Sequence, residues 1–322
     1  MPFSNILVRA TNWVGDAVMC VPALQALRGR FPAARIAILA KPWVAGLYAR
    51  EPFADEVIPY TQGYWGTART LRARRFDAAI LLQNAFEAAL IAWLARIPVR
   101  IGYNRDARGL LLTSAVPVPA PGEISRHQRF YYLELLRRAG LIPRLPESDA
   151  IHLTRPQVAL RPIIGVSPGA AYGGAKRWLP ERFAEAAATV ADVHGASIAL
   201  FGSASERAVC DQIAALLPGR EVINHAGRTT LAEFIDLAAA CQVFLTNDSG
   251  AMHIASALGV PTVAVFGATD HEATGPTGSR ARIVREPVDC SPCLLRECPI
   301  DHRCMTRVPS GRVAEEALKL IE

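Results

Sequence analysis

Short hydrophobic, β-branched runs alternate with longer stretches of mixed hydrophobic and polar residues through most of the chain. Such runs are typical of buried strands, and the stretches between them have the spacing of amphipathic helices. This alternation predicts an α/β protein built from βα units around parallel sheets. We expect strands at residues 6–10, 36–40, 78–83, 99–103, 163–167, 197–202, 222–225, 243–247 and 262–267.

The alternation lapses in a proline-rich stretch near the middle of the chain. Closely spaced prolines neither continue helices nor supply donors to a sheet, so a domain boundary is expected there. We place two Rossmann-like domains at residues 1–157 and 158–322. The periodicity also predicts a final helix over residues 312–321, capped by Ser310, which could pack back on the N-terminal domain. Two such sheets should leave an interdomain cleft, with ligands beyond the carboxyl ends of the strands.

Composition narrows the class of protein. The chain has 322 residues, 51% of them hydrophobic, which suffices for two cores. Its formal charge is +6, but charged residues make up an ordinary 20% and no dense Lys/Arg block occurs, so nucleic acid is not an expected partner. The basic excess lies in residues 1–150, which hold 19 Lys and Arg against 11 Asp and Glu.

Targeting and redox signals point to the cytoplasm. The first residues lack the pattern of a secretory signal, and no apolar run approaches the roughly 18 residues of a membrane span. Seven cysteines, an odd number unevenly placed, suit a reducing compartment better than a disulfide framework. Cys20, Cys210 and Cys241 lie in apolar surroundings and are expected to be buried.

Asp16 is the first candidate for chemistry. It follows the first expected strand, near the start of a helix, on the edge where substrates bind in α/β proteins. A carboxylate there could simply complement the helix dipole. It could also serve as a general base that takes a proton from an acceptor hydroxyl.

A glycine-rich loop over residues 168–178 follows the first strand of the second half. Its glycines would let the backbone approach a ligand, and Lys176 and Arg177 could neutralise phosphate. The alternative is a flexible loop with two solvated cations. Neither half has GxGxxG after its first strand, so a nicotinamide cofactor is not predicted.

The strongest local pattern is NDSGAMH at residues 247–253, after a hydrophobic strand and at a helix start. Backbone N–H groups there, with the Ser249 hydroxyl, would form an anion site suited to a diphosphate. Asp248 would repel phosphate by itself, so we expect it to cap the helix or to bind a ligand hydroxyl. His253, one turn into the helix, could donate to a ligand or be structural.

Four late cysteines form a separate cluster, CxxC-x4-C-x5-C at positions 290, 293, 298 and 304, with His302 beside the last. Thiolates at this density could bind zinc or an iron–sulfur cluster. The spacing is irregular, however, and prolines beside two of the cysteines suit a tight loop equally well.

Taken together, these motifs resemble the ADP-heptose:lipopolysaccharide heptosyltransferases of glycosyltransferase family 9, in particular their heptosyltransferase II-type members. The likeness covers nearly the whole chain. The segments that carry it are VRATNWVGDAVMCVPALQALR, PGAAYGGAKRWLPERF, FLTNDSGAMHIASALGVPTVAVFG and CSPCLLRECPIDHRCM.

The resemblance implies a GT-B fold, with two Rossmann-like domains facing each other across a cleft. It also implies inverting transfer of heptose from ADP-L-glycero-D-manno-heptose to the lipopolysaccharide inner core, without a metal or other cofactor. Asp16 matches the family's general base. The positions that match donor-binding residues are Lys176, Glu206, Asp248, Ser249, Gly250 and His253.

The basic N-terminal half suits an acceptor that carries carboxylates and phosphates. Arg100, Arg105 and Arg126 are its expected acceptor-binding residues, and Arg108 and Arg129 are further candidates. Because the acceptor is borne on lipid, this half is also expected to make a peripheral contact at the cytoplasmic face of the inner membrane. Two alternatives stay open: a nucleotide-sugar 2-epimerase of the same architecture, and a non-catalytic metal or redox module built on the cysteine cluster.

Overall fold

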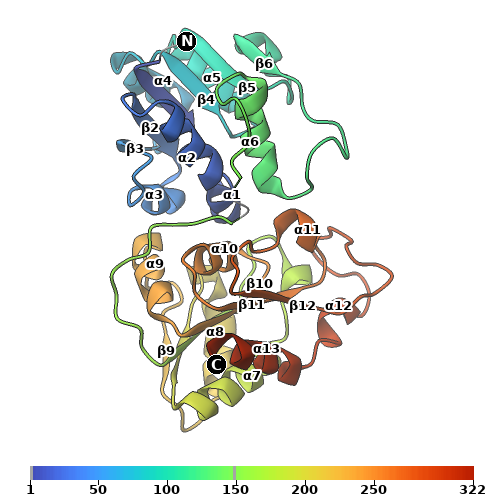
Figure 1. Ribbon diagram of the computed structural model, residues 1–322. Coiled ribbons are helices and arrows are strands. Elements are labelled where there is room, and N and C mark those ends of the chain that lie inside the picture. The colour runs from blue at the N-terminus through green and yellow to red at the C-terminus, as the bar shows by residue number, and fades with distance from the viewer. Residues whose placement is uncertain (1–2, 148–149) are drawn as a thin grey trace. The chain divides into compact units, whose positions relative to one another are not determined.

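Two parallel six-stranded sheets form among residues 3–147 and 150–322, which are the residues that this computed structural model describes (Figure 1). The strand orders are β3-β2-β1-β4-β5-β6 and β12-β11-β10-β7-β8-β9. If the strands of the second sheet are numbered 1 to 6 starting from β7, their order is that of the first sheet read in the opposite direction. The chain divides accordingly into two compact units, Met1–Asp149 and Ala150–Glu322.

The first unit follows the βα pattern expected from the sequence. Its elements are β1 (Asn5–Arg9), α1 (Val14–Met19), α2 (Val21–Arg30), β2 (Arg35–Ala40), α3 (Pro42–Tyr48), β3 (Glu56–Pro59), α4 (Tyr64–Ala73), β4 (Ala78–Leu81), α5 (Phe86–Leu94), β5 (Val99–Tyr103), the 3₁₀ turn η1 (Gly109–Leu111), β6 (Ser114–Val116) and α6 (Gln128–Arg138).

The second unit repeats the pattern. Its elements are β7 (Ile163–Ser167), η2 (Gly174–Lys176), α7 (Pro180–His194), β8 (Ser197–Leu200), η3 (Ala204–Glu206), α8 (Arg207–Ala215), β9 (Val222–Asn224), α9 (Leu231–Ala240), β10 (Val243–Asn247), α10 (Gly250–Ala257), β11 (Thr262–Phe266), α11 (His271–Thr274), β12 (Ala281–Arg285), α12 (Arg303–Thr306) and α13 (Ser310–Ile321).

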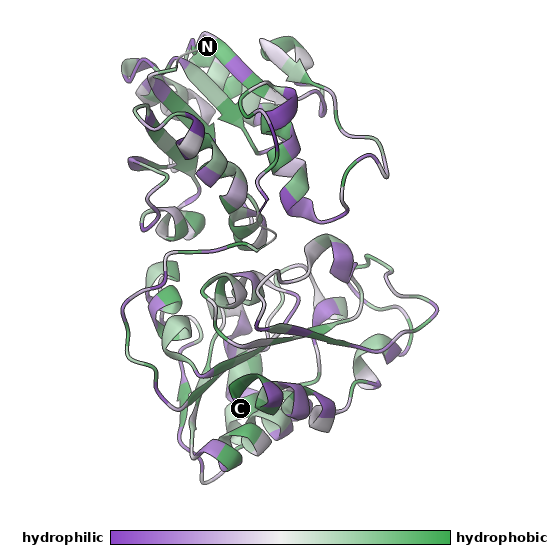
Figure 2. Cartoon of the chain, in the orientation of Figure 1, coloured by the Kyte–Doolittle hydropathy of each residue, from purple (hydrophilic) through white to green (hydrophobic). Residues whose placement is uncertain are grey.

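Central strands are hydrophobic on both faces because helices cover both sides of each sheet. All five residues of β10 and of β11 are buried, and β1 is buried from Ile6 onward. In the first sheet, Leu7 pairs in register with Ala37 of β2 and Ala79 of β4. The helices of Figure 2 carry hydrophobic and hydrophilic residues together, as amphipathic helices on a sheet do.

Of two expectations about the C-terminal helix, packing back on the N-terminal domain stays a prediction, and capping by Ser310 is wrong. Val313, Ala317 and Leu320 of α13 belong to the same buried cluster as the β7 residues Ile164 and Val166, so the helix packs within its own unit. Ser310 does not cap α13. It is the first helical residue, Pro309 occupies the cap position, and the Ser310 hydroxyl donates to Glu185 at 2.6 Å.

The division between the units lies a few residues before the expected boundary at residues 157 and 158. Hydrogen bonds tie the intervening segment to the second unit. The amide of Ile151 donates to Thr277 Oγ1, and that of Leu153 donates to the carbonyl of Ala257, both at 2.9 Å. Residues 150–157, which were expected in the first domain, therefore belong to the second unit.

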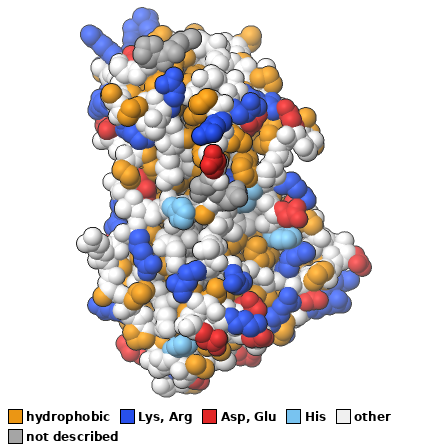
Figure 3. All heavy atoms as spheres, viewed as in Figure 1, with side chains coloured by type: hydrophobic (Ala, Val, Ile, Leu, Met, Phe, Trp, Pro, Cys, Tyr) orange, Lys and Arg blue, Asp and Glu red, His pale blue; other side chains and the backbone are white. Residues whose placement is uncertain are grey.

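The face of the surface drawn in Figure 3 lacks one dense basic patch. Lys and Arg side chains lie at many separate places among neutral and acidic ones (Figure 3). Throughout the part of the chain that the structure describes, the helices lack either the length or the apolar composition that crossing a bilayer requires.

Candidate active site

Asp16 lies at the carboxyl edge of the first sheet, in the first turn of α1, as the sequence predicts. A connection of only four residues, 10–13, joins it to β1. The hydroxyl of Tyr132 in α6 donates to Asp16 Oδ1 at 3.0 Å. Burial, and then the nearby Asp16 charge, raise the pKa of Tyr132 well above its ordinary value, so the phenol stays protonated and remains a donor. The carboxylate is half-buried and has a fixed orientation, which a general base requires.

The predicted acceptor-binding arginines have different positions. Arg105 follows the carboxyl end of β5 and is half-exposed, and its guanidinium lies 3.4 Å from Asp106. Arg126 is exposed, in the connection that leads from β6 to α6. Connections that follow parallel strands lie at the carboxyl edge, so both share that edge with Asp16.

Arg100, in contrast, is the second residue of β5 and lies near the amino end of that strand. Its guanidinium donates to the carbonyls of Leu111 at 2.6 Å and Ile97 at 2.5 Å. These bonds tie the strand to the neighbouring turn, so the structure gives Arg100 a structural role, and we leave it out of the acceptor site. Arg108 and Arg129 are also left out, because both are buried.

In the second sheet, the start of α10 has the geometry that the sequence predicts for an anion site. Ser249 is the N-cap of α10, and its hydroxyl accepts from the amide of Met252 at 3.4 Å. Gly250 is the first residue of the helix. The amide groups of the first helical turn point along the axis toward any ligand, and the helix dipole favours an anion there.

The Lys176 ammonium lies beside this helix start and pairs with Asp248 at 2.6 Å. Asp248 Oδ2 also accepts from the hydroxyls of Thr269 at 2.5 Å and Thr274 at 3.5 Å. The expectation that Asp248 caps the helix is therefore wrong, because Ser249 does so. Asp248 instead fixes the lysine, whose ammonium group carries further donors for a phosphate oxygen.

Asn247 anchors both ends of the loop that carries Lys176. Its amide nitrogen donates to the carbonyl of Pro168 at 2.7 Å, and its amide oxygen accepts from the backbone of Trp178 at 3.0 Å. Asn247 is fully buried at the end of β10. One side chain thus joins the beginning and the end of a loop of twelve residues, 168–179, to the neighbouring strand.

Glu206 and His253 flank the same edge in different ways. Glu206 Oε2 accepts from the backbone amide and the hydroxyl of Ser203, both at 2.8 Å, in a capping box at the start of η3. Its other oxygen lies against Gly169, where a Cβ would meet it at 2.0 Å. His253 is 5% exposed, inside α10. Glu206 therefore faces the loop, whereas His253 is mostly enclosed by protein.

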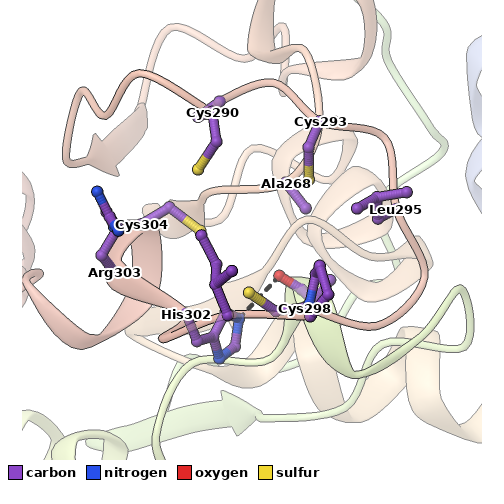
Figure 4. A pocket seen from close by; sticks show the side chains of 12 residues that line it. Ala268, Cys290, Cys293, Leu295, Cys298, His302, Arg303 and Cys304 are labelled. Atoms are coloured by element: carbon purple, nitrogen blue, oxygen red, sulfur yellow. Dashed lines mark hydrogen bonds between the residues drawn. The ribbon is translucent and has the colours of Figure 1, made fainter.

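The four late cysteines line one small cavity of about 70 Å³, with His302 and Ala175 in the same wall (Figure 4). Burial, and then three neighbouring thiols, raise the pKa of the Cys304 thiol to about 11. As they lie, no three His, Cys, Asp or Glu side chains among the described residues form a group that could hold a metal ion. Cys20, Cys210 and Cys241 are buried, as the sequence predicts.

The sequence analysis assigned no role to three residues that hydrogen-bond to the candidate residues or to their loop: Tyr132, Asn247 and Thr269. Tyr132 lies 116 positions from Asp16 and sits inside an ordinary amphipathic helix, so nothing local marks it. Asn247 had a signal, since an amide at the end of a wholly apolar strand must find partners when it is buried.

Comparisons with known proteins identify the family. The sequence model of "Glycosyltransferase family 9 (heptosyltransferase)" matches residues 65–303. Lipopolysaccharide heptosyltransferase 2 of Salmonella typhimurium and that of Escherichia coli are each 34% identical over 306 residues, with 87% of this chain and 88% of the relative covered.

Solved structures show the same architecture. The structure of E. coli ADP-heptose lps heptosyltransferase II has a TM-score of 0.84 at 31% identity, with 98% of each chain covered. E. coli heptosyltransferase WaaC with ADP has a TM-score of 0.78 at 18% identity, with 98% of this chain and 99% of that chain covered, and shows the fold alone. The fold is GT-B, as expected, and neither the epimerase nor the non-catalytic module is favoured. The chain belongs to glycosyltransferase family 9, the heptosyltransferases.

Proposed function

We propose that this enzyme transfers heptose from ADP-L-glycero-D-manno-heptose to the inner core of lipopolysaccharide, with inversion at the anomeric carbon. Relatives at 34% identity are lipopolysaccharide heptosyltransferases 2, which supports both the donor and the acceptor. The observation that carries the proposal in this chain is the Lys176–Asp248 pair beside the Ser249-capped start of α10. A fixed ammonium next to a helix N-terminus is suited to a diphosphate.

The reaction divides between the two sheets. Asp16 accepts the proton of the acceptor hydroxyl as its oxygen attacks the anomeric carbon. The bond between that carbon and the diphosphate breaks, and ADP leaves with the bonding electrons. Lys176 and the amides at Gly250 then stabilise the negative charge that grows on the leaving phosphate. Because this charge grows during bond breaking, fixed donors lower the transition state more than the ground state.

The remaining site residues have secondary parts in the proposal. Glu206, next to Gly169, would bind a hydroxyl of the nucleoside ribose. Arg105 and Arg126, at the carboxyl edge of the first sheet, would engage the anionic groups of the acceptor. His253 would act as a further donor toward the diphosphate, although its burial makes this contribution smaller than that of Lys176.

The proposal includes a peripheral contact at the cytoplasmic face of the inner membrane. Residues 1–150 carry the basic excess of the chain, and Trp13, Trp43 and Trp65 of the same unit are 56%, 58% and 65% exposed. Basic residues are attracted to anionic headgroups, and tryptophan favours the membrane interface. Sedimentation with anionic vesicles, at low and high salt, tests this part separately.

The decisive experiment is a transfer assay read by mass spectrometry. Kdo2-lipid A and its mono-heptosylated form are each offered with ADP-heptose, and with UDP- and GDP-sugars as controls. We expect the mass of one heptose to be added to the mono-heptosylated acceptor from ADP-heptose alone. Addition from a UDP- or GDP-sugar, or no addition although ADP binds, would contradict the proposal.

A further inference from the structure

The cysteine-rich segment after β12 lies against the loop that carries Lys176. Hydrogen bonds join the two across more than 120 positions of sequence: Tyr172 Oη to the Leu294 carbonyl at 2.7 Å, the Gly174 amide to Glu297 Oε1 at 2.9 Å, the Ala175 amide to the Arg296 carbonyl at 2.9 Å, and His302 Nε2 to the Ala175 carbonyl at 3.0 Å. The last of these is the dashed line of Figure 4. Four hydrogen bonds from residues 294–302 therefore hold the short 172–175 stretch from outside the loop.

The two adjacent glycines of the loop correspond to this contact. A Cβ at Gly173 would lie 2.2 Å from the carbonyl oxygen of Arg296, and one at Gly174 would lie 2.3 Å from Glu297 Oε2. A backbone carbonyl cannot turn aside as the end of a side chain can. Gly173, which by sequence suggests close approach to a ligand, is thus required by the approach of the Arg296 carbonyl, whereas at Gly174 the contact is with the end of the Glu297 side chain.

The segment is itself anchored at the carboxyl end of β11. The amide of Leu294 donates to the Ala268 carbonyl at 2.8 Å, and Ser291 Oγ donates to the Gly267 carbonyl at 2.6 Å. Cys304, at its far end, is buried in the core cluster of the unit. Thr269, just after these anchors, donates to Asp248, the partner of Lys176, so the same end of β11 contacts both the segment and the lysine pair.

We propose that residues 291–302 are a positioning segment that holds Lys176 at the phosphate site, with Glu297 as its principal side chain. This inference rests on the proposed function of Lys176. Lysine has a flexible stem, and its loop contains only the single turn η2. Without outside contacts, the loop would sample many conformations, and a mobile cation must be reorganised at each turnover.

Glu297 offers a test with a built-in rescue. Replacing it with alanine removes the acceptor of the Gly174 amide, whereas Glu297→Gln keeps an acceptor oxygen and removes only the charge. We expect Glu297→Ala to speed hydrogen exchange of the 172–176 amides in the free protein by roughly 3- to 10-fold and to lower kcat by a similar factor, the size of one hydrogen bond. Glu297→Gln should restore most of both losses. Glu221→Ala, at an exposed glutamate of the same unit, is the control and should change neither.

A second variant acts through the backbone. Gly173→Ala should displace the Arg296 carbonyl and raise exchange of the same amides further, in a protein that circular dichroism shows to be folded. Wild-type exchange in both Glu297→Ala and Gly173→Ala, or equal loss in Glu297→Ala and Glu297→Gln, would overturn the inference. Hydrogen exchange needs no substrate, so failure of the proposed heptose transfer in wild type would leave this arm of the test intact.

Discussion

The two sheets have the same strand order but hold their key residues in opposite ways. After the first strand of the first sheet, four residues lead directly into a helix, and Asp16 is in the first turn of that helix. After the first strand of the second sheet, twelve residues form a loop, and Lys176 lies near its end. Asp16 is therefore held within a helix, with Tyr132 as one hydrogen-bond partner, whereas Lys176 is held by contacts gathered from distant parts of the unit.

This difference fits the roles proposed for the two residues. A general base must meet one hydroxyl at one place, and a position in the first turn of a helix fixes the backbone that carries it. A cation that serves a diphosphate must reach beyond the end of a strand, and a loop gives it that reach. Because a long loop has more conformational freedom to lose on ordering, the longer connection needs contacts from outside the loop to fix it. Lys176 should therefore be sensitive to substitutions at many distant positions of its unit.

The largest expected effect is at the base. Asp16→Asn keeps the size of the side chain and its hydrogen-bond acceptor for Tyr132, but it can no longer take a proton. We expect kcat to fall by roughly 10²- to 10⁴-fold, the usual contribution of a general base, with ADP affinity unchanged. Steady-state transfer assays and calorimetric titration with ADP measure the two quantities. An Asp16→Asn enzyme with wild-type kcat would remove Asp16 from the mechanism.

Lys176 gives the next largest effect and has a neighbouring control. Lys176→Met should weaken ADP binding roughly 10- to 100-fold, the value of one or two charge-assisted hydrogen bonds. Arg177 is the adjacent cation, but it is exposed, and its guanidinium donates to the Ala170 carbonyl at 3.4 Å. Arg177→Met should therefore change the affinity less than about threefold, within the range of a surface contact. Equal losses in the two variants would mean that net charge, and not the position of Lys176, attracts the nucleotide.

Asn247 tests whether the loop depends on distant contacts. Asn247→Ala leaves the Pro168 carbonyl and the Trp178 amide without their partner, and should lower the free energy of unfolding by about 2 kcal/mol, the cost of an unsatisfied buried polar group. Urea denaturation measures it. Asn224 of the same unit also makes two hydrogen bonds but is half-exposed, so Asn224→Ala should cost less because water can replace its bonds. If the two variants lose equal stability, the burial of Asn247 adds nothing to the value of its two hydrogen bonds.

The sequence predicts the central strands well. The bounds of β7 and β10 are as expected, because these strands lie inside the second sheet and are almost wholly buried. The bounds of β5 are also as expected, although this strand carries Arg100. The edge strand β9 was expected at residues 222–225 and ends at Asn224. The other edge strands, β3, β6 and β12, were missed. They are short or carry exposed polar residues, so their pattern does not differ from that of a loop.

The candidate site residues show a similar contrast between local and long-range features. Asp16, Lys176 and Ser249 stand in local motifs, since strand, connection and helix start are neighbours in sequence. The contacts that orient them are long-range: Tyr132 to Asp16 spans 116 positions, and Glu297 to Gly174 spans 123. A single sequence contains no local pattern for such pairs. The candidate residues could therefore be named from local motifs, while the contacts that position them required the structure.

The smallest expected effect concerns the thiols behind the loop. A raised pKa keeps a thiol protonated, and only the thiolate reacts with a disulfide reagent such as DTNB. At pH 8 the exposed Cys290 should react first, whereas Cys304, with its pKa raised to about 11, should be at least about tenfold slower and should gain nearly tenfold in rate per pH unit up to that value. Cys20 and Cys241, whose burial raises their pKa to about 12, should react more slowly still. Mass spectrometry of the labelled peptides measures each rate.

If Cys304 reacts as fast as Cys290 at pH 8, the cavity opens readily and the segment around it is too mobile to position Lys176. If Cys304 stays protected, the cavity stays closed around it, as a fixed segment behind the loop requires.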